Sequence, residues 1–189
     1  VQAAHRATSN EALEVAVDRA NARGVPVIAL FCSTANYPEA NERHVGFMFE
    51  GLCELEATLG KRRISLYAAA CAPPEAIVKA SDRACEVVVD GAYLRLLRRW
   101  REDLAKRATC AVTEVEGECV VPQLGSSTRT PEISAATFRP KVLPLVERYT
   151  RVPCSILPYI AGSLGDDVRR VFESTLSEFD LLPLADGVD

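Results

Sequence analysis

Several patterns that identify common protein classes are absent from this sequence. It contains no GxGxxG, GxxxxGK(S/T) or GxSxG motif, so the usual dinucleotide-binding, Walker-type and serine-hydrolase interpretations lack the residues that carry them. No apolar run reaches the roughly 18 residues that a membrane-spanning helix needs. The first residues also lack the basic-then-apolar pattern of a signal peptide. We therefore expect no membrane partner and a cytoplasmic location.

Metal-binding patterns are missing as well. The seven cysteines form no CxxC pair and have no histidine at ligand spacing. Of the two histidines, His44 lies on the apolar face of a predicted helix, where we expect it to be packed, and His5 is far from it in the chain. We expect no metal site and interpret the cysteines as buried free thiols in a reducing compartment.

The composition is that of an ordinary globular protein. The chain has 189 residues, of which 48% are hydrophobic and 25% charged, and this length suffices for one substantial core. The formal net charge of −4 argues against a nucleic-acid coat protein, although a local basic face on an acidic body remains compatible with DNA binding.

Strand-like and helical patterns alternate along the chain. Apolar runs of strand length occupy 25–32, 63–70 and 85–90, and 110–122 supplies one or two more, broken at Gly117. Helical spacing occurs between these runs, at residues 9–24, 41–60, 74–83 and from about Tyr93 onward. The pattern predicts an α/β fold: a doubly wound, mostly parallel, five-stranded Rossmann-like sheet with helices on both faces.

The character of the sequence changes after Gln123. A polar loop is followed by a helical pattern interrupted by Pro140 and Pro144, then by a proline-marked extended stretch and one more amphipathic helix. We therefore expect an α/β domain over residues 1–150 and, over residues 151–189, a helical or extended linker that leads toward a further domain. Because a doubly wound sheet normally opens with a central strand, we also expect that the first strand is truncated here.

Four blocks of sequence resemble one protein family. Residues 2–21, 38–52, 87–102 and 137–142 are similar to the N-terminal antenna-type α/β domain of class II cyclobutane pyrimidine dimer photolyases. Each block alone is weak evidence, but the four occur in family order over residues 1–150 and on the predicted fold.

The resemblance implies a function that is shared with other parts of such a protein. The α/β domain of these photolyases can hold a light-harvesting antenna chromophore, either deazaflavin-like or folate-like. A larger helical domain binds FAD and damaged DNA and performs light-driven repair. We expect that FAD domain outside these 189 residues, no catalytic residues within them, and no photolyase (lyase) activity from them alone.

The candidate cofactor-binding residues follow from the predicted sheet. Open parallel sheets bind ligands at the carboxyl ends of their strands. Polar side chains in the loops at that edge could surround a planar chromophore: Arg6, Asn10, Ser33, Thr34, Asn36, Asp90 and Tyr93.

A purely structural interpretation of the same residues stays open. Asn10 and Ser33 could cap helices, Arg6 could anchor its loop to a carboxylate, and Asp90 could end its strand in a turn.

The arginine-rich helix from about Tyr93 also has two interpretations. Trp100 lies on its apolar stripe, which we expect to face the sheet. The arginines then form a solvated face with Arg99–Asp103 and Glu102–Lys106 pairs, or a docking face for another domain or for DNA phosphates.

Two other functions remain compatible with the sequence. One is a stand-alone Rossmann-like nucleotide-binding or electron-transfer module, although this sequence lacks the glycine-rich phosphate-binding loop that such a module normally has. The other is a ligand-free interaction domain.

Overall fold

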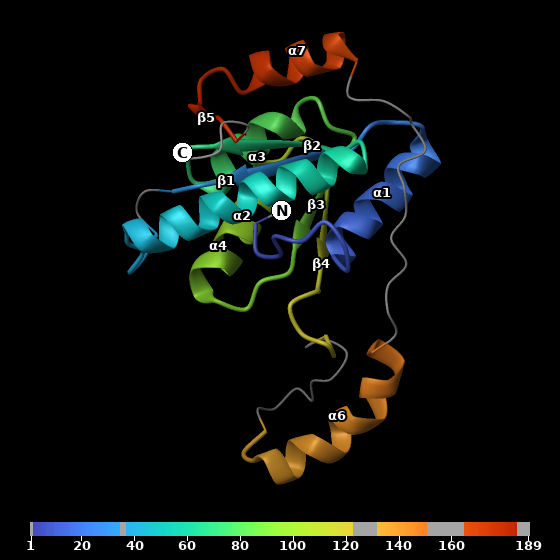
Figure 1. The fold of residues 1–189 in the computed structure, drawn as a ribbon. Coiled ribbons are helices and arrows are strands. Elements are labelled where there is room, and N and C mark those ends of the chain that lie inside the picture. The colour runs from blue at the N-terminus through green and yellow to red at the C-terminus, as the bar shows by residue number, and fades with distance from the viewer. Residues whose placement is uncertain (1, 35–36, 123–131, 151–164, 185–189) are drawn as a thin grey trace.

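The structure, a computed structural model, describes residues 2–34, 37–122, 132–150 and 165–184 (Figure 1). The helices are α1 (Glu11–Arg23), α2 (Glu42–Lys61), α3 (Pro73–Ser81), α4 (Arg95–Arg107), α6 (Ala135–Tyr149) and α7 (Asp166–Thr175). The strands are β1 (Ile28–Cys32), β2 (Ser65–Ala69), β3 (Glu86–Asp90), β4 (Ala111–Val115) and β5 (Leu181–Leu182). Helices and strands alternate from α1 to β4, as the sequence pattern predicts.

Helix ends follow local sequence signals. Gly24 ends α1 in the left-handed region, with φ 67°, where a residue without a Cβ is favoured. Asn41 caps α2, and its own backbone N–H donates to Nδ1 of His44 at 3.3 Å. His44 is exposed, so the expectation of a packed histidine is wrong: the imidazole serves as a partner in the helix cap.

The strands form two separate sheets in the described part of the chain. β1 pairs with β2 in parallel register from Ile28–Ser65 to Cys32–Ala69, and β5 pairs antiparallel with β2. β3 pairs with β4 in parallel register from Glu86–Ala111 to Asp90–Val115. The strand orders are β1-β2-β5 and β3-β4.

The α/β class with parallel strands is confirmed, but the single five-stranded sheet is wrong for these residues. The predicted second strand after Gly117 does not form, and the fifth strand is instead the short β5 near the end of the chain. Its antiparallel pairing with β2 joins residues far apart in the sequence, which periodicity does not reveal.

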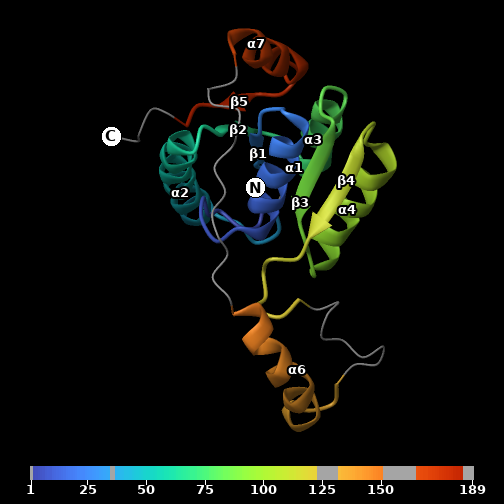
Figure 2. The ribbon, with the colours of Figure 1, turned by 90° about the vertical axis from the view of Figure 1, so that its right-hand side faces the viewer.

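Helices cover both faces of the strands (Figures 1 and 2). Strand residues alternate between the two faces, so two apolar clusters form. The first joins α1 and α2 to β1 and β2, with Leu13, Val17, Ala29, Phe31, Leu52, Leu55, Leu59, Leu66 and Ala68 among its members. The second joins α3, α4 and α7 to the opposite face, with Cys32, Ala69, Ala76, Ile77, Ala80, Val89, Leu104, Phe172 and Leu176. This doubly wound arrangement confirms the predicted covering of both faces.

The residues beyond 150 include α7 and β5, which pack on the α/β body. Phe172 and Leu176 of this segment are buried in the second cluster. The expected domain boundary at residue 150 remains a prediction. By contrast α6, which continues through Pro140 and Pro144, contains no buried residue and lies apart from the other elements in both views (Figures 1 and 2).

None of the helices in the described ranges is long and apolar enough to cross a membrane.

Candidate functional site

The segment before α1 lies across the carboxyl ends of β1 and β3. Nε2 of Gln2 donates to the carbonyl oxygen of Cys32 at 2.9 Å, and Oε1 of Gln2 accepts from the Cys32 N–H at 3.2 Å. The backbone N–H groups of Gln2 and Ala3 donate to Oδ2 of Asp90 at 2.9 and 3.0 Å. Gln2 thus links the end of β1 to the end of β3, two strands that belong to different sheets.

Asp90 is an anchor at this edge. Its side chain is buried, and burial raises its pKa. The N–H groups of Ala3, Gln2 and Ala4 act in the opposite direction, and the net pKa of Asp90 lies below its ordinary value. The carboxylate therefore stays charged at neutral pH and holds the first segment in place.

Asn10 uses its side chain to build the same loop. It is 2% exposed. Its Oδ1 accepts from the Leu13 N–H at 3.1 Å, and its Nδ2 donates to the carbonyl oxygens of Ala4 and Arg6 at 3.0 and 3.1 Å. The capping interpretation of Asn10 is confirmed, because these bonds engage both of its donors and its acceptor.

The loop after β3 is held by carboxylates. Tyr93 donates from its hydroxyl to Oε1 of Glu116 at 3.2 Å, and the Ala92 N–H donates to Oε1 of Glu114 at 3.2 Å. A Cβ on Gly91 would lie 3.1 Å from the Cα of Glu116, so glycine permits the close approach of the two chain segments here.

Arg6, Ser33 and Thr34 keep their polar groups available. Arg6 is exposed, and Ser33 and Thr34 are half-buried. Ser33 donates its backbone N–H to the Ala69 carbonyl at 2.9 Å, and within the described residues none of the three side chains makes a hydrogen bond or ion pair. Within the part of the chain that the structure describes, Ser33 caps no helix and Arg6 is not anchored to a carboxylate. Asn36 lies outside the described residues.

Sequence reasoning missed Arg101. The helical pattern places it to the side of α4, yet it is 7% exposed and its Nε donates to the Asp90 carbonyl at 2.9 Å. Burial lowers its pKa, while Asp90, Glu114 and Glu118 act in the opposite direction. The sequence gave no signal for this, because burial of an arginine depends on partners elsewhere in the chain.

The arginine-rich face of α4 differs from the prediction. Trp100 is half-buried, and its ring lies 6.4 Å from the ring of Tyr37 instead of in the core. Asp103 pairs with Arg107 at 2.7 Å and not with Arg99. Arg107 also makes two parallel bonds to Glu75, at 2.9 and 3.0 Å, and these bonds lower the pKa of the Glu75 carboxyl. Arg107 therefore ties α4 to α3.

The cysteines are mostly not buried. Of the six in the described ranges all are free thiols, as predicted, but Cys32 alone is buried. The hydrogen bond with Cys71, together with burial, raises the pKa of Cys32. The prediction of uniformly buried thiols is wrong.

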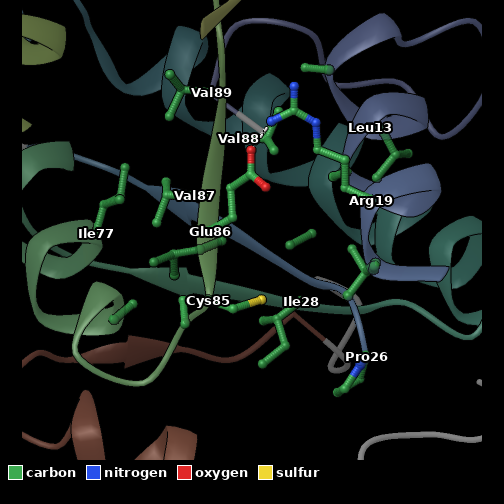
Figure 3. A pocket seen from close by; sticks show the side chains of 18 of the residues that line it. Leu13, Arg19, Pro26, Ile28, Ile77, Cys85, Glu86, Val87, Val88 and Val89 are labelled. Carbon is green, nitrogen blue, oxygen red and sulfur yellow. Dashed lines mark hydrogen bonds and ion pairs between the residues drawn. The ribbon is translucent and has the colours of Figure 1, made fainter. Parts of the chain in front are cut away.

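A cavity of about 390 Å³ lies between β1 and β3. Figure 3 shows β3 with Leu13 and Arg19 of α1 on one side and Ile77 of α3 on the other. Two predicted site residues, Asn10 and Asp90, line the cavity, together with Gln2 and Arg101.

One buried carboxylate faces α1 in this cavity. Glu86 accepts hydrogen bonds from Arg19 and from the Thr113 hydroxyl, the latter at 2.7 Å, and it pairs with Arg23 at 3.1 Å. The two arginines balance the negative charge of the Glu86 carboxylate, and the contacts hold β3 against α1.

Together these features define an α/β domain with both faces covered and a polar edge at the strand carboxyl ends. The sequence profile of the DNA photolyase family matches residues 1–156. A deoxyribodipyrimidine photo-lyase of Methanothermobacter thermautotrophicus is 33% identical over 179 residues, which are 95% of this chain and 40% of that protein. One from Arabidopsis thaliana is 32% identical over 148 residues, which are 76% of this chain and 30% of that protein. The chain belongs to the DNA photolyase family.

The fold is also that of a solved photolyase. A crystal structure of the archaeal photolyase from Sulfolobus tokodaii superposes with a TM-score of 0.65, at 16% sequence identity, over 90% of this chain and 39% of that one. The chain thus spans well under half the length of these relatives. The expectation that the chain belongs to the photolyases is confirmed, and the class II and antenna assignments remain predictions.

Proposed function

We propose that this chain is the N-terminal α/β domain of a class II photolyase-like protein and binds a light-harvesting chromophore. Light-driven repair of damaged DNA would then be performed by a flavin-bearing helical domain, in the cytoplasm. The observation that carries the proposal is the match of the photolyase family over residues 1–156. Both curated relatives are deoxyribodipyrimidine photo-lyases, and the Sulfolobus tokodaii structure is described as containing two FAD molecules and implying a novel light-harvesting cofactor.

The strand-end loops fit such a chromophore in part. Arg6, Ser33 and Thr34 offer a charged group and two hydroxyls that make no bonds within the described residues. Arginine can stack on a planar ring or bind an anionic group, and hydroxyls can donate to ring heteroatoms. We assign the direct contacts to these three residues and to Asn36.

The other three candidates act through the loops. Asn10, Asp90 and Tyr93 already bond to Leu13, Gln2 and Glu116 respectively. We assign them the role of holding the first and fourth loops in a fixed position, so that little conformational entropy is lost when a ligand binds.

The bound chromophore supplies absorption of light and transfer of its energy to the flavin. The chain itself orients the chromophore at the strand ends and excludes water from one face of it.

An absorption and fluorescence spectrum of protein purified under dim light tests the proposal. We expect a visible or near-ultraviolet band, and denaturation should release a deazaflavin or a folate. If none copurifies, the apoprotein should bind added deazaflavin or folate. Binding of neither contradicts the antenna function and favours a ligand-free interaction domain.

Paired substitutions locate the contacts. Ser33→Ala and Arg6→Ala should each weaken chromophore binding about tenfold, since each removes one polar contact worth about 1–2 kcal/mol. Thr58→Ala and Arg43→Ala, at exposed positions on α2, should leave binding unchanged. If the control substitutions weaken chromophore binding as much as Ser33→Ala and Arg6→Ala do, the assignment of the chromophore site to the strand-end loops is wrong.

A further inference from the structure

Two cysteines meet at the carboxyl ends of β1 and β2. Cys32 is the last residue of β1, and Cys71 lies two residues after the end of β2. The Ala69 carbonyl oxygen accepts the N–H of Ser33 at 2.9 Å and the N–H of Cys71 at 3.1 Å. The second of these bonds spans only two residues, so the chain turns tightly after β2 and Cys71 stays beside the end of β1.

The side chains of the two cysteines face each other. Their thiols are joined by a hydrogen bond in which Cys32 is the donor. Sγ of Cys32 also lies 4.0 Å from the carbonyl oxygen of Pro73, so it points toward the segment that carries Cys71. Neighbouring strands lie about 4.8 Å apart, and the Cα atoms of a disulfide lie about 4.4–6.8 Å apart. Cysteines at the ends of adjacent strands therefore suit a disulfide.

The surroundings of the two thiols differ. Cys32 is 1% exposed within the apolar cluster of α3 and α7, whereas Cys71 is half-buried. The hydrogen bond from Cys32 lowers the pKa of Cys71, and the N–H of Ala76, near the start of α3, acts in the same direction against burial and the charge of Glu75. Accessible thiols of lowered pKa are the ones that react first. Cys71 is thus suited to attack an oxidant, and Cys32 to react afterwards with Cys71.

The same pair of thiols is less suited to a metal. Structural zinc sites use four protein ligands, and the described ranges contain no group of three or more His, Cys, Asp or Glu side chains that could hold a metal ion. In reducing compartments, disulfides are usually transient and serve catalysis or redox sensing. The arrangement therefore favours a reversible reaction between the two thiols.

We propose that Cys32 and Cys71 form a redox-active dithiol site in which a peroxide oxidises Cys71 and Cys32 then resolves it to a disulfide. The Cys71 thiolate attacks one oxygen of hydrogen peroxide, the O–O bond breaks, and Cys71 becomes a sulfenic acid as hydroxide leaves. The Cys32 thiol gives up its proton, and its sulfur attacks the Cys71 sulfur. The S–S bond forms as the S–O bond breaks, and the leaving hydroxide takes up a proton. Two thiols and one hydrogen peroxide thus give one disulfide and two waters.

The disulfide would close a loop of the chain that contains α2 and β2. A cross-link of this kind restricts the unfolded chain, so the oxidised form should unfold at a higher urea concentration than the reduced form. Ser33 follows Cys32 directly, yet the inference does not depend on chromophore binding, because the reaction involves only the two thiols and the peroxide.

Peptide mapping of the full 189-residue chain tests the proposal. The reduced protein is treated with hydrogen peroxide at neutral pH, alkylated, digested without reductant and measured by mass spectrometry. We expect a linked Cys32–Cys71 peptide as the main product, which dithiothreitol removes. Cys53 on α2, which is half-buried like Cys71, is the matched control and should be alkylated as a free thiol. Linkage of other cysteines in place of this pair overturns the proposal.

Two variants test the order of the reaction. Cys32→Ala removes the resolving thiol, so Cys71 should remain a sulfenic acid and give at least about tenfold more dimedone adduct than in the parent chain. Cys71→Ala should leave the buried Cys32 unreacted. Cys85→Ala, at an exposed cysteine, should form the Cys32–Cys71 disulfide as the parent does. Circular dichroism establishes that each variant is folded. If folded Cys32→Ala gives no adduct at Cys71, the assigned roles are wrong.

The same oxidation in concentrated urea shows whether the fold brings the thiols together. Unfolding separates the ends of β1 and β2, so the preference for the Cys32–Cys71 linkage should be lost among the other pairings. If the preference persists in urea, the folded geometry is not its cause and the proposal is overturned.

Discussion

The two sheets of this domain are stabilised by different kinds of contact. β1 and β2 lie in an apolar cluster with α2, where Leu52 and Leu59 are 0% exposed. β3 contributes Val89 to the second apolar cluster, and charged and polar groups also hold it: Glu86 bonds to Arg19 and Thr113, and Asp90 to Gln2 and Ala3. β4 contains no buried residue. The sheet of β3 and β4 thus relies more on charged and polar contacts, and the sheet of β1 and β2 relies more on apolar packing.

The difference teaches that two pairs of parallel strands in one domain can be stabilised by different kinds of contact, although each has one edge at the same cavity. β1 has β2 along one edge and β3 has β4, and the other edge of each strand borders the cavity. The long helix α2 packs on the face of β1 and β2. Substitutions on the two sides should therefore differ in size and in their dependence on pH.

The largest effect is expected where a charge is buried on the packed side. Arg62 is 6% exposed and bonds to Glu14 at 2.9 and 3.0 Å and to the Ala7 carbonyl. Arg62→Ala leaves the Glu14 carboxylate buried without its countercharge and should lower the free energy of unfolding by about 3–5 kcal/mol. Urea unfolding measures the loss. Lys61→Ala, at the exposed neighbouring position, should stay within about 0.5 kcal/mol, and a loss below about 1 kcal/mol for Arg62→Ala would contradict the prediction.

The apolar cluster should respond next most strongly. Leu52→Ala removes a fully buried side chain between α2 and the strands and should cost about 2–4 kcal/mol, from lost burial plus the cavity left behind. Leu143→Ala on α6, where the side chain is 59% exposed, is the matched control and should change stability by less than about 0.5 kcal/mol. Similar losses at both positions in urea unfolding would show that α6 is packed in solution.

On the cavity side, Asp90→Ala should cost about 2 kcal/mol at neutral pH, because it removes a charged acceptor of two backbone N–H groups. The folded-state pKa of Asp90 is depressed. Its contribution is therefore fully present above the ordinary carboxyl pKa and is lost as pH falls through the folded-state pKa. The difference between the parent chain and Asp90→Ala, measured by urea unfolding at a series of pH values, should shrink in acid. A difference that is constant with pH would assign the loss to packing instead.

The smallest effect is expected at the surface contact between α3 and α4. Arg107→Gln removes the two bonds to Glu75, so the pKa of the Glu75 carboxyl, now lowered by Arg107, should rise toward its ordinary value. An NMR titration of the side-chain carboxyl measures this. The contact stabilises the fold only while the Glu75 carboxyl is ionised. The small loss of stability in Arg107→Gln should therefore vanish in acid and shrink in high salt. Arg99→Gln, on an exposed arginine of the same helix, should leave the Glu75 pKa unchanged.

Much of the fold could be predicted because its signals are local. The Asn10 cap and the Gly24 terminator bound α1, and the apolar runs at 25–32 and 85–90 contain β1 and β3. The short separation of each strand from its helix also predicts parallel pairing with crossovers. The blocks of family sequence point to photolyases for the same reason: they are runs of consecutive residues.

The candidate site was predictable only in outline. The rule that ligands bind at strand carboxyl ends selects the loops. It does not separate Asn10 and Asp90, whose side chains bond to the chain itself, from Arg6, Ser33 and Thr34, whose side chains make no bond among the described residues. That separation depends on the paths of backbone segments up to 88 residues apart in sequence.

By itself, the sequence determined the succession of helices and strands, their caps and the family, because periodicity, turn residues and motifs are properties of neighbouring residues. The tertiary structure alone decided that Arg101 is buried, that β5 joins β2 and that a cavity separates β1 from β3. These features arise from contacts between distant residues, whose energies depend on burial and geometry that no local pattern contains.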